Sequence, residues 1–343
     1  MKILDLNGKW ELRDAAGAPL CSVEVPGTVI SGLCAAGKIE NPYYRENEYA
    51  VRDLFWKDYR FVRSFVVDKE LMGAKELNLV CRGLDTLAQI CINGKELAVT
   101  DNMHRTYTFS VREYVQEGEN EICITFRSVL RYIEQYSYRE NREIRHVVPC
   151  GAVRGNQLVR KGHSMFGWDW GAHLPDAGIF RPVSLIGVKK ARLLGVYVRQ
   201  EHVDGEVRLH LNPEVSEAVC TADQEGLVYT AEIKAPDGSV QSYADSPKEV
   251  LIERPQLWWP NGYGGQPLYT VKVTLYADGE PVDVWERRIG LRTMTVRIRK
   301  DEWGECFAHE VNGVAVFAMG ADYIPEDHLL GRVSLQTTRK LLE

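Results

Sequence analysis

The first half of the chain consists of short runs in which apolar and polar residues alternate. Such runs occupy residues 60–67, 76–81 and 121–126. A period of two residues is typical of strands with one buried and one exposed face. Between two further apolar runs, Asn93-Gly94 is the pair that a type I′ hairpin turn favours. Many short strands with turns between them, from Met1 to about Gly187, predict a β-sandwich or jelly roll.

A second, shorter module repeats this β pattern from about Ala191 to Arg292. Its strand-like runs are residues 196–199, 207–211 and 269–276. Roughly a hundred residues with this spacing fit an immunoglobulin-like sandwich. The cysteine and tryptophan spacing of antibody domains is absent from the sequence, so the likeness concerns the architecture only.

The pattern changes after Arg292. A hairpin turn is predicted at Asn312-Gly313, and it leads into the apolar run 314–319. A loop rich in Gly, Asp and Pro follows, and then a predicted helix over 334–343 with Ser334 as its N-cap. The few apolar positions of this helix are Leu335, Leu341 and Leu342. One βα unit cannot bury both faces of a parallel strand, so we expect the chain to be part of a longer protein.

The composition is that of a globular protein and limits the partners. The 343 residues are 45% hydrophobic and 26% charged, which suits two or three domains. The net charge is -6 and no basic stripe is present, so nucleic acid is not an expected partner. The amino terminus lacks the apolar run of a signal peptide, and no segment approaches about 18 consecutive apolar residues. We expect a soluble, cytoplasmic protein with no membrane partner.

The cysteines are scattered without a Cys-x-x-Cys motif or a Cys/His ligand spacing. The eight are Cys21, Cys34, Cys81, Cys91, Cys123, Cys150, Cys220 and Cys306. Several stand in apolar, strand-like runs, which favours small buried hydrophobic residues over disulfides or metal ligands. We expect no metal site and no cofactor.

The most distinctive stretch is His163-Ser164-Met165-Phe166-Gly167-Trp168-Asp169-Trp170-Gly171. Two tryptophans around an aspartate suit a sugar, because an indole face packs on the C–H face of a pyranose and a carboxylate accepts hydrogen bonds from hydroxyls. The alternative is a buried aromatic plug in which Asp169 ties down a loop. The spacing alone does not separate the two interpretations.

This stretch resembles the Gly-Trp-Asp-Trp-Gly segment of the β-mannosidases in glycoside hydrolase family 2, which also contains β-galactosidases and β-glucuronidases. Other segments resemble that family as well, and the resemblance covers nearly the whole chain. In the first module these are residues 6–10, 25–29, 37–44, 82–88, 99–105 and 118–121; later ones are 257–264, 265–269 and 288–292. They occur across the family, whereas the Trp-Asp-Trp segment points to β-mannosidases.

The resemblance implies a mainly β fold in three parts. These are a jelly-roll, galactose-binding-like β-sandwich over 1–188, an immunoglobulin-like β-sandwich over 189–293, and the first βα unit of a truncated TIM barrel over 294–343. It also implies an exo-acting, retaining β-mannosidase whose substrate is a β-mannoside oligosaccharide. Trp168, Asp169 and Trp170 would bind this sugar. Asp322 and Tyr323 could line the same pocket, with Asp322 standing where relatives commonly carry Asn, although both could equally support a loop.

The chain lacks an evident catalytic pair. Retaining glycosidases need two carboxyl groups about 5 to 5.5 Å apart, and the resemblance places both on later barrel strands. Asn47-Glu48 is expected in a polar loop and Asn120-Glu121 at the start of a strand, so both pairs are interpreted as structural. Glu326 and Asp327 are neighbours in a loop and their side chains should diverge. The histidines are dispersed, and a lone histidine is more often structural than a base. We expect no catalytic residue in this chain.

Three alternatives stay open. The shared motifs allow a β-galactosidase or β-glucuronidase specificity. The jelly roll could instead be a stand-alone carbohydrate-binding module, or both sandwiches could only shape and oligomerise a barrel. The oligomeric state is not settled by the sequence, a homodimer included.

Overall fold

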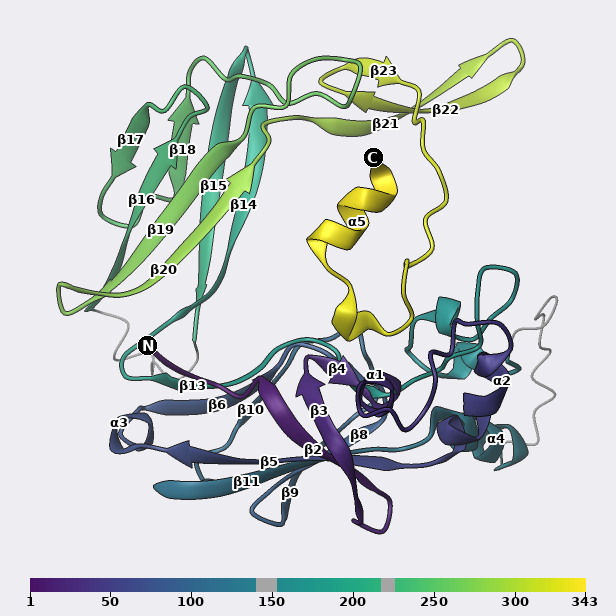
Figure 1. Ribbon diagram of the computed structural model, residues 1–343. Coiled ribbons are helices and arrows are strands. Elements are labelled where there is room, and N and C mark those ends of the chain that lie inside the picture. The colour runs from purple at the N-terminus through teal and green to yellow at the C-terminus, as the bar shows by residue number, and fades with distance from the viewer. Residues whose placement is uncertain (140–152, 217–225) are drawn as a thin grey trace. The chain divides into compact units, whose positions relative to one another are not determined.

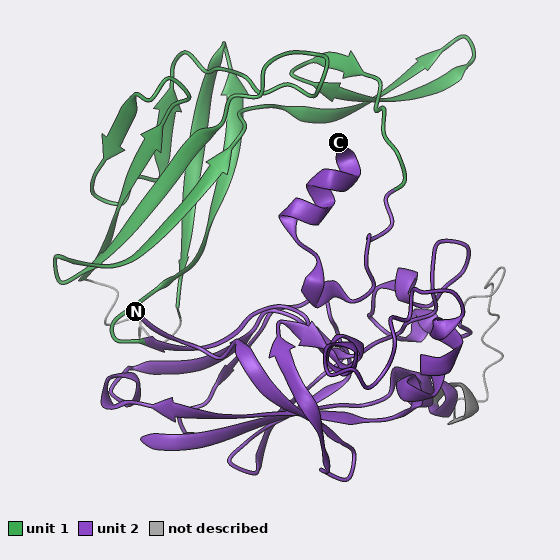
Figure 2. Cartoon of the chain, viewed as in Figure 1, with its two compact units in different colours: residues 1, 188–322 green, residues 2–187, 323–343 purple. Residues whose placement is uncertain are grey.

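A computed structural model describes residues 1–139, 153–216 and 226–343. The chain forms two compact units (Figure 2). Unit 1 contains residues 188–322 together with Met1, and unit 2 contains residues 2–187 and 323–343. The chain therefore leaves unit 2, completes unit 1, and then returns to unit 2.

Unit 2 is built on two main β-sheets around one apolar core (Figure 1). The larger sheet has the order β3-β2-β5-β11-β8-β9, and every neighbouring pair in it is antiparallel. The second has the order β1-β13-β6-β10, and a small third sheet has the order β4-β12-β7. The strands are β1 (Lys2–Asp5), β2 (Gly8–Asp14), β3 (Pro19–Val25), β4 (Gly27–Thr28), β5 (Tyr59–Val67), β6 (Glu76–Cys81), β7 (Leu84–Asp85), β8 (Ala88–Ile92), β9 (Lys95–Thr100), β10 (Tyr107–Ser110), β11 (Gly118–Phe126), β12 (Gly178–Ile179) and β13 (Val183–Val188).

The alternation in the sequence is confirmed in these strands. The predicted runs lie within β5, β6 and β11. Phe61 of β5 is fully buried, and its ring packs edge to face on that of Phe126 in β11, with 5.3 Å between the centroids. The predicted hairpin turn is also confirmed, because Asn93 and Gly94 have φ of 50° and 77°, as a type I′ turn requires.

Unit 2 also contains short helices. They are α1 (Val29–Ala35), α2 (Asn47–Val51), α3 (Lys69–Met72), α4 (Val129–Arg139) and, in the returning segment, α5 (Leu335–Leu342). The Thr28 hydroxyl accepts from the Ser31 N–H at 3.2 Å, and the Ser31 hydroxyl accepts from the Thr28 N–H at 2.8 Å, which starts α1. Helix α2 replaces the polar loop expected at Asn47-Glu48, and Glu48 pairs with Arg52 four residues later at 2.9 Å.

Unit 1 contains a two-layered sandwich of antiparallel strands. One sheet has the order β14-β15-β18 and the other β17-β16-β19-β20. Val207 and Leu209 of the first sheet share a core with Val271 and Val273 of the second, and all four are fully buried. The strands are β14 (Leu193–Val203), β15 (Glu206–Val215), β16 (Leu227–Lys234), β17 (Val240–Tyr243), β18 (Glu249–Ile252), β19 (Tyr269–Ala277) and β20 (Glu280–Ile289).

The last part of unit 1 is a three-stranded antiparallel sheet that the sequence analysis did not anticipate. It consists of β21 (Met294–Asp301), β22 (Gly304–Val311) and β23 (Val314–Val316). The alternation Met294, Val296, Ile298 is a strand pattern, but these side chains are largely exposed, so no buried face accompanies it. The hairpin predicted at Asn312-Gly313 is confirmed as the turn between β22 and β23.

Of the predicted barrel unit, residues 294–343 contain the helix but no strand with parallel neighbours. Val314–Val316 pairs antiparallel with β22, whereas a barrel strand would need parallel neighbours, and Phe317 and Met319 are exposed outside any strand. The barrel therefore stays a prediction. The helix after it is confirmed as α5, with Ser334 as N-cap accepting from the Thr337 N–H at 3.2 Å.

The six cysteines in the described part of the chain are free thiols. Cys81 is buried, which raises the pKa of its thiol to about 12, and the other five are half-buried. Cys150 and Cys220 lie outside the described residues. Among the described helices, none is long and apolar enough to cross a lipid bilayer.

Candidate functional site

The Trp168 loop, residues 167–172 of unit 2, stands on a buried apolar base. Phe166 and His173 form an antiparallel bridge that closes the loop. The side chains of Phe166 and Leu174 on either side are fully buried, together with Ile30 of α1. The Leu174 N–H donates to the Met165 carbonyl at 2.9 Å. Both ends of the loop are therefore held in the core while its tip projects.

The path of the loop depends on Gly167. Its φ is 92°, and a Cβ at this position would lie 1.6 Å from Cδ2 of His173. Any side chain would therefore collide with the imidazole ring. The next residue, Trp168, also has a positive φ of 75°, which is uncommon for a residue with a Cβ. The imidazole of His173 thus packs where a side chain at position 167 would be.

The tip of the loop presents two indoles and a carboxylate. The rings of Trp168 and Trp170 pack edge to face, with 4.1 Å between their centroids and an interplanar angle of 71°. Trp168 is half-buried, Trp170 is 38% exposed and Asp169 is exposed. The tip is therefore not a buried aromatic plug. A half-exposed indole beside an exposed carboxylate can pack on a sugar ring and accept hydrogen bonds from its hydroxyls.

The ion pair of Arg52 and Glu48 holds the ring of His173 in place. Arg52 donates to Nδ1 of His173 at 3.0 Å and to Glu48 at 2.9 Å, and its guanidinium lies 4.3 Å from the centroid of the Tyr49 ring. Burial, and then the positive charge of Arg52, lower the pKa of His173. The imidazole is therefore neutral at pH 7 and accepts through Nδ1, which fixes the orientation of its ring.

Beneath the loop lies a buried polar network centred on Lys161. The Lys161 side chain is completely buried and its ammonium pairs with the carboxylate of Asp85 at the end of β7. The same ammonium donates to the backbone carbonyl of Asp176 at 2.7 Å. The Thr86 hydroxyl donates to the other oxygen of Asp85. An ammonium leaves water only when such partners satisfy it, so these contacts fix both sides of the segment that carries the loop.

The carboxylate of Asp176 closes the network at the start of α1. It accepts from the backbone N–H of Ile30 at 3.2 Å and of Ala177 at 2.8 Å, and it also bonds with Thr28. Burial raises the pKa of Asp176 to about 6, although these hydrogen bonds and the charge of Lys161 act in the opposite direction. Desolvation therefore outweighs the favourable contacts at this carboxyl.

The other two predicted sugar-binding residues are not part of this loop. Asp322 is an exposed residue of unit 1, and Tyr323, the first residue of the segment that returns to unit 2, is 54% exposed. A role in the sugar pocket stays a prediction for both. Glu326 and Asp327 have separate partners: Thr338 donates to the first, and Tyr43 and Arg332 contact the second.

The sequence predicts the tip of the loop but not the residues that support it. Lys161 and Asp85 are 76 residues apart, and no local pattern links them. His173 and His328 are among the dispersed histidines interpreted as structural; the first is half-buried and the second buried, whereas His146 lies outside the described residues. A lysine next to an apolar, glycine-rich segment was the one available signal for Lys161.

Both modules match known families. Residues 10–181 match "Glycosyl hydrolase 2 galactose-binding domain-like", and residues 191–292 match "Glycosyl hydrolases family 2". The chain is 28% identical to "Beta-mannosidase B" of Emericella nidulans and 26% identical to "Beta-mannosidase" of Bos taurus. These alignments cover 98% and 99% of this chain but 41% and 40% of the relatives. The chain thus spans about 40% of the length of the curated relatives it matches.

A solved structure supports the same family relationship. The crystal structure of Beta-D-Mannosidase from Dictyoglomus thermophilum has a TM-score of 0.84 and 30% sequence identity to this chain. The match covers 100% of this chain and 42% of the other. The similarity therefore extends over the Trp168 loop and both sandwiches.

The first prediction concerns the Lys161 ion pair. Lys161→Met leaves the carboxylate of Asp85 buried without its cation, so the free energy of unfolding should fall by about 3–5 kcal/mol. In the double variant Lys161→Met/Asp85→Asn neither charge remains, and the loss should be well below the sum of the two single losses. Urea denaturation of the four proteins measures this coupling. Strictly additive losses would contradict a direct interaction.

The second prediction concerns Asp176. A carboxyl whose pKa is raised by folding binds its proton more tightly when folded, so its contribution to stability is present below about pH 4 and is lost as the pH rises through about 6. Compared with Asp176→Asn, the wild type should lose on the order of 2 kcal/mol between these limits. Denaturation across this pH range, with the exposed Asp101→Asn as control, measures the difference. A difference that does not vary with pH would contradict the burial of an ionisable group here.

Proposed function

Since the chain belongs to glycoside hydrolase family 2, we propose that it is the N-terminal, non-catalytic region of a β-mannosidase. The enzyme removes terminal β-D-mannose from the non-reducing end of oligosaccharides and retains the anomeric configuration. Support for the family comes from both modules, and support for mannose comes from the names of the relatives given above.

The geometry of the Trp168 loop carries this proposal. A fixed loop that presents two edge-to-face indoles and an exposed carboxylate has the chemistry of a sugar subsite. Trp168 packs on the apolar face of the pyranose, and Asp169 accepts hydrogen bonds from two of its hydroxyls. A carboxylate at the closed end of a pocket leaves no room for a further sugar unit, which gives exo action. Trp170 and Tyr323 line the remainder of the pocket, and a role of Asp322 in sugar binding stays a prediction.

We infer that the two carboxyl groups that cleave the glycosidic bond lie outside this chain. The candidate pairs inside it have structural partners instead. Glu48 pairs with Arg52 and Asp327 pairs with Arg332, while Glu121 is a strand residue of β11 whose backbone N–H donates to the side chain of Asn93. A retaining hydrolase needs two carboxyl groups about 5 to 5.5 Å apart and free to reach the anomeric carbon. The chain by itself should therefore be folded but inactive.

The third prediction tests the assignment by hydrolysis. We expect a chromogenic β-mannoside to be cleaved by the longest protein that the gene encodes and not by the 343-residue chain. β-Galactoside and β-glucuronide substrates are run beside it. Cleavage of one of these in place of the mannoside would keep the family and refute the sugar. Activity of the 343-residue chain itself would refute the non-catalytic role.

The fourth prediction concerns Asp169 in that longest protein. Removing a charged acceptor from two sugar hydroxyls costs about 1.5–3 kcal/mol, so kcat/KM for the β-mannoside should fall roughly 10- to 100-fold in Asp169→Ala. Asp101→Ala removes an exposed carboxylate elsewhere in unit 2 and serves as the control. Unchanged kcat and KM in Asp169→Ala would remove the loop from the substrate site.

A further inference from the structure

Residues 326–332 of the returning segment are built into unit 2. Leu329 is fully buried in the same apolar cluster as Ile30, Phe166 and Leu174, which forms the base of the Trp168 loop. Gly331 lies so close to the jelly roll that a Cβ there would meet Cα of Gly27 at 2.7 Å. The segment is therefore part of the fold of unit 2, although about 130 residues of unit 1 precede it in the chain.

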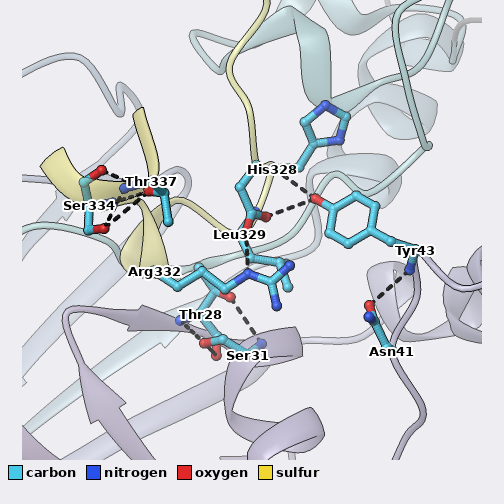
Figure 3. A network of polar contacts seen from close by, with 10 residues as sticks. Thr28, Ser31, Asn41, Tyr43, His328, Leu329, Arg332, Ser334 and Thr337 are labelled. Carbon is cyan, nitrogen blue, oxygen red and sulfur yellow. Dashed lines mark hydrogen bonds and ion pairs between the residues drawn. The ribbon is translucent and has the colours of Figure 1, made fainter. Parts of the chain in front are cut away.

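Polar contacts hold the same segment at Tyr43. The Tyr43 hydroxyl donates to Asp327 at 2.9 Å and accepts from the backbone N–H of His328 at 2.8 Å (Figure 3). Asp327 also accepts from the Leu329 N–H at 2.8 Å and pairs with Arg332, whose guanidinium lies 5.4 Å from the centroid of the Tyr43 ring. These contacts set the backbone of residues 327–329, and so they set the direction of the His328 side chain.

The imidazole of His328 lies against the Trp168 loop. His328 is 4% exposed, and a Cβ at Gly171 would lie 3.1 Å from its Cε1 and 3.4 Å from its Nε2. The ring bonds with the backbone of Ala172, while Nδ1 is buried without a hydrogen-bond partner among the described residues. Gly171 and Ala172 directly follow Trp170, so the contact is made at the C-terminal side of the loop tip.

If position 328 served packing alone, an apolar side chain would fill it and leave no buried polar atom unsatisfied. The orphaned Nδ1 carries a desolvation cost that an apolar side chain of similar size would avoid. Leu329, the next residue, already fills the apolar cluster. The imidazole gains two things that a leucine would lack, namely a donor for the backbone of Ala172 and a flat ring that fits against Gly171.

We propose that His328 is a positioning residue for the Trp168 loop: its buried ring, held by the Tyr43–Asp327 contacts, fixes residues 171–172 and thereby the placement of the two indoles and of Asp169. The segment that follows unit 1 thus sets the shape of the sugar subsite carried by unit 2. The role in sugar binding rests on the proposed function, whereas the effect on the loop does not.

The experiment on the loop uses hydrogen exchange of the 343-residue chain, followed by mass spectrometry of peptides from residues 163–178. His328→Ala removes the ring and its donor, so loop amides should exchange about three- to tenfold faster. His328→Gln keeps a donor near the position of Nε2 and should restore most of the protection. Leu329→Ala is the structural comparator, and His104→Ala, at an exposed histidine of unit 2, is the control.

Selective deprotection of the loop in His328→Ala, with rescue by glutamine, supports the proposal. Loop exchange equal to that of His104→Ala would overturn it. A uniform rise over the whole of unit 2, as expected for Leu329→Ala, would also overturn it, since that pattern indicates a packing role only.

The effect on the site is measured on the longest protein that the gene encodes. With a chromogenic β-mannoside, His328→Ala should raise KM about three- to tenfold with a smaller change in kcat, and His328→Gln should restore KM. An unchanged KM in His328→Ala would overturn the link to the subsite. If the wild-type protein cleaves no β-mannoside, the proposed function fails, and the exchange experiment alone still decides whether His328 positions the loop.

Discussion

The constraint on which the rest of unit 2 depends is the burial of one ammonium group, that of Lys161. Taking an ion of this size out of water costs several kcal/mol, and the cost is offset only while all of its partners stay in place. Asp85 comes from β7, and the Asp176 carbonyl comes from the segment before β12, so the ion joins parts of the chain that are distant in sequence. Such a pair adds little net stability over apolar residues, but it strongly penalises any arrangement in which one partner is displaced.

From this fixed point the arrangement of the Trp168 loop follows in steps. Residues 161–176 are held at both ends by the network, and the bridge between Phe166 and His173 narrows the freedom left to residues 167–172. Gly167 then allows the ring of His173 to pack against the backbone, and Arg52 fixes the tautomer of that ring. These polar contacts and the apolar packing around them thus keep the side chains of Trp168 and Trp170 partly exposed. Aromatic side chains would otherwise favour the interior.

The features that the sequence predicts are those that depend on residues close together in the chain. Strands such as β6 and the Asn93-Gly94 turn follow from a two-residue period and from backbone preferences within a few residues. The tip of the loop was recognised because Trp168, Asp169 and Trp170 are adjacent. Strands β21 and β22 were missed because a short alternation such as Met294, Val296 and Ile298 was too weak a signal by itself. Contacts such as Tyr43 with Asp327, 284 residues apart, leave no local trace.

Because of these long-range contacts, unit 2 is assembled from residues 2–187 and 323–343. The apolar cluster below the loop takes Ile30 from α1, Phe166 and Leu174 from the loop base, and Leu329 from the returning segment. Without Leu329 the cluster would contain a cavity, and a cavity in a core lowers the free energy of unfolding. Gly331 against Gly27 and Leu330 against Met103 and Met165 extend the same contact along the jelly roll. The jelly roll therefore reaches its full packing only after the chain has completed unit 1 and returned, which couples the geometry of the loop to residues that follow both sandwiches in the sequence.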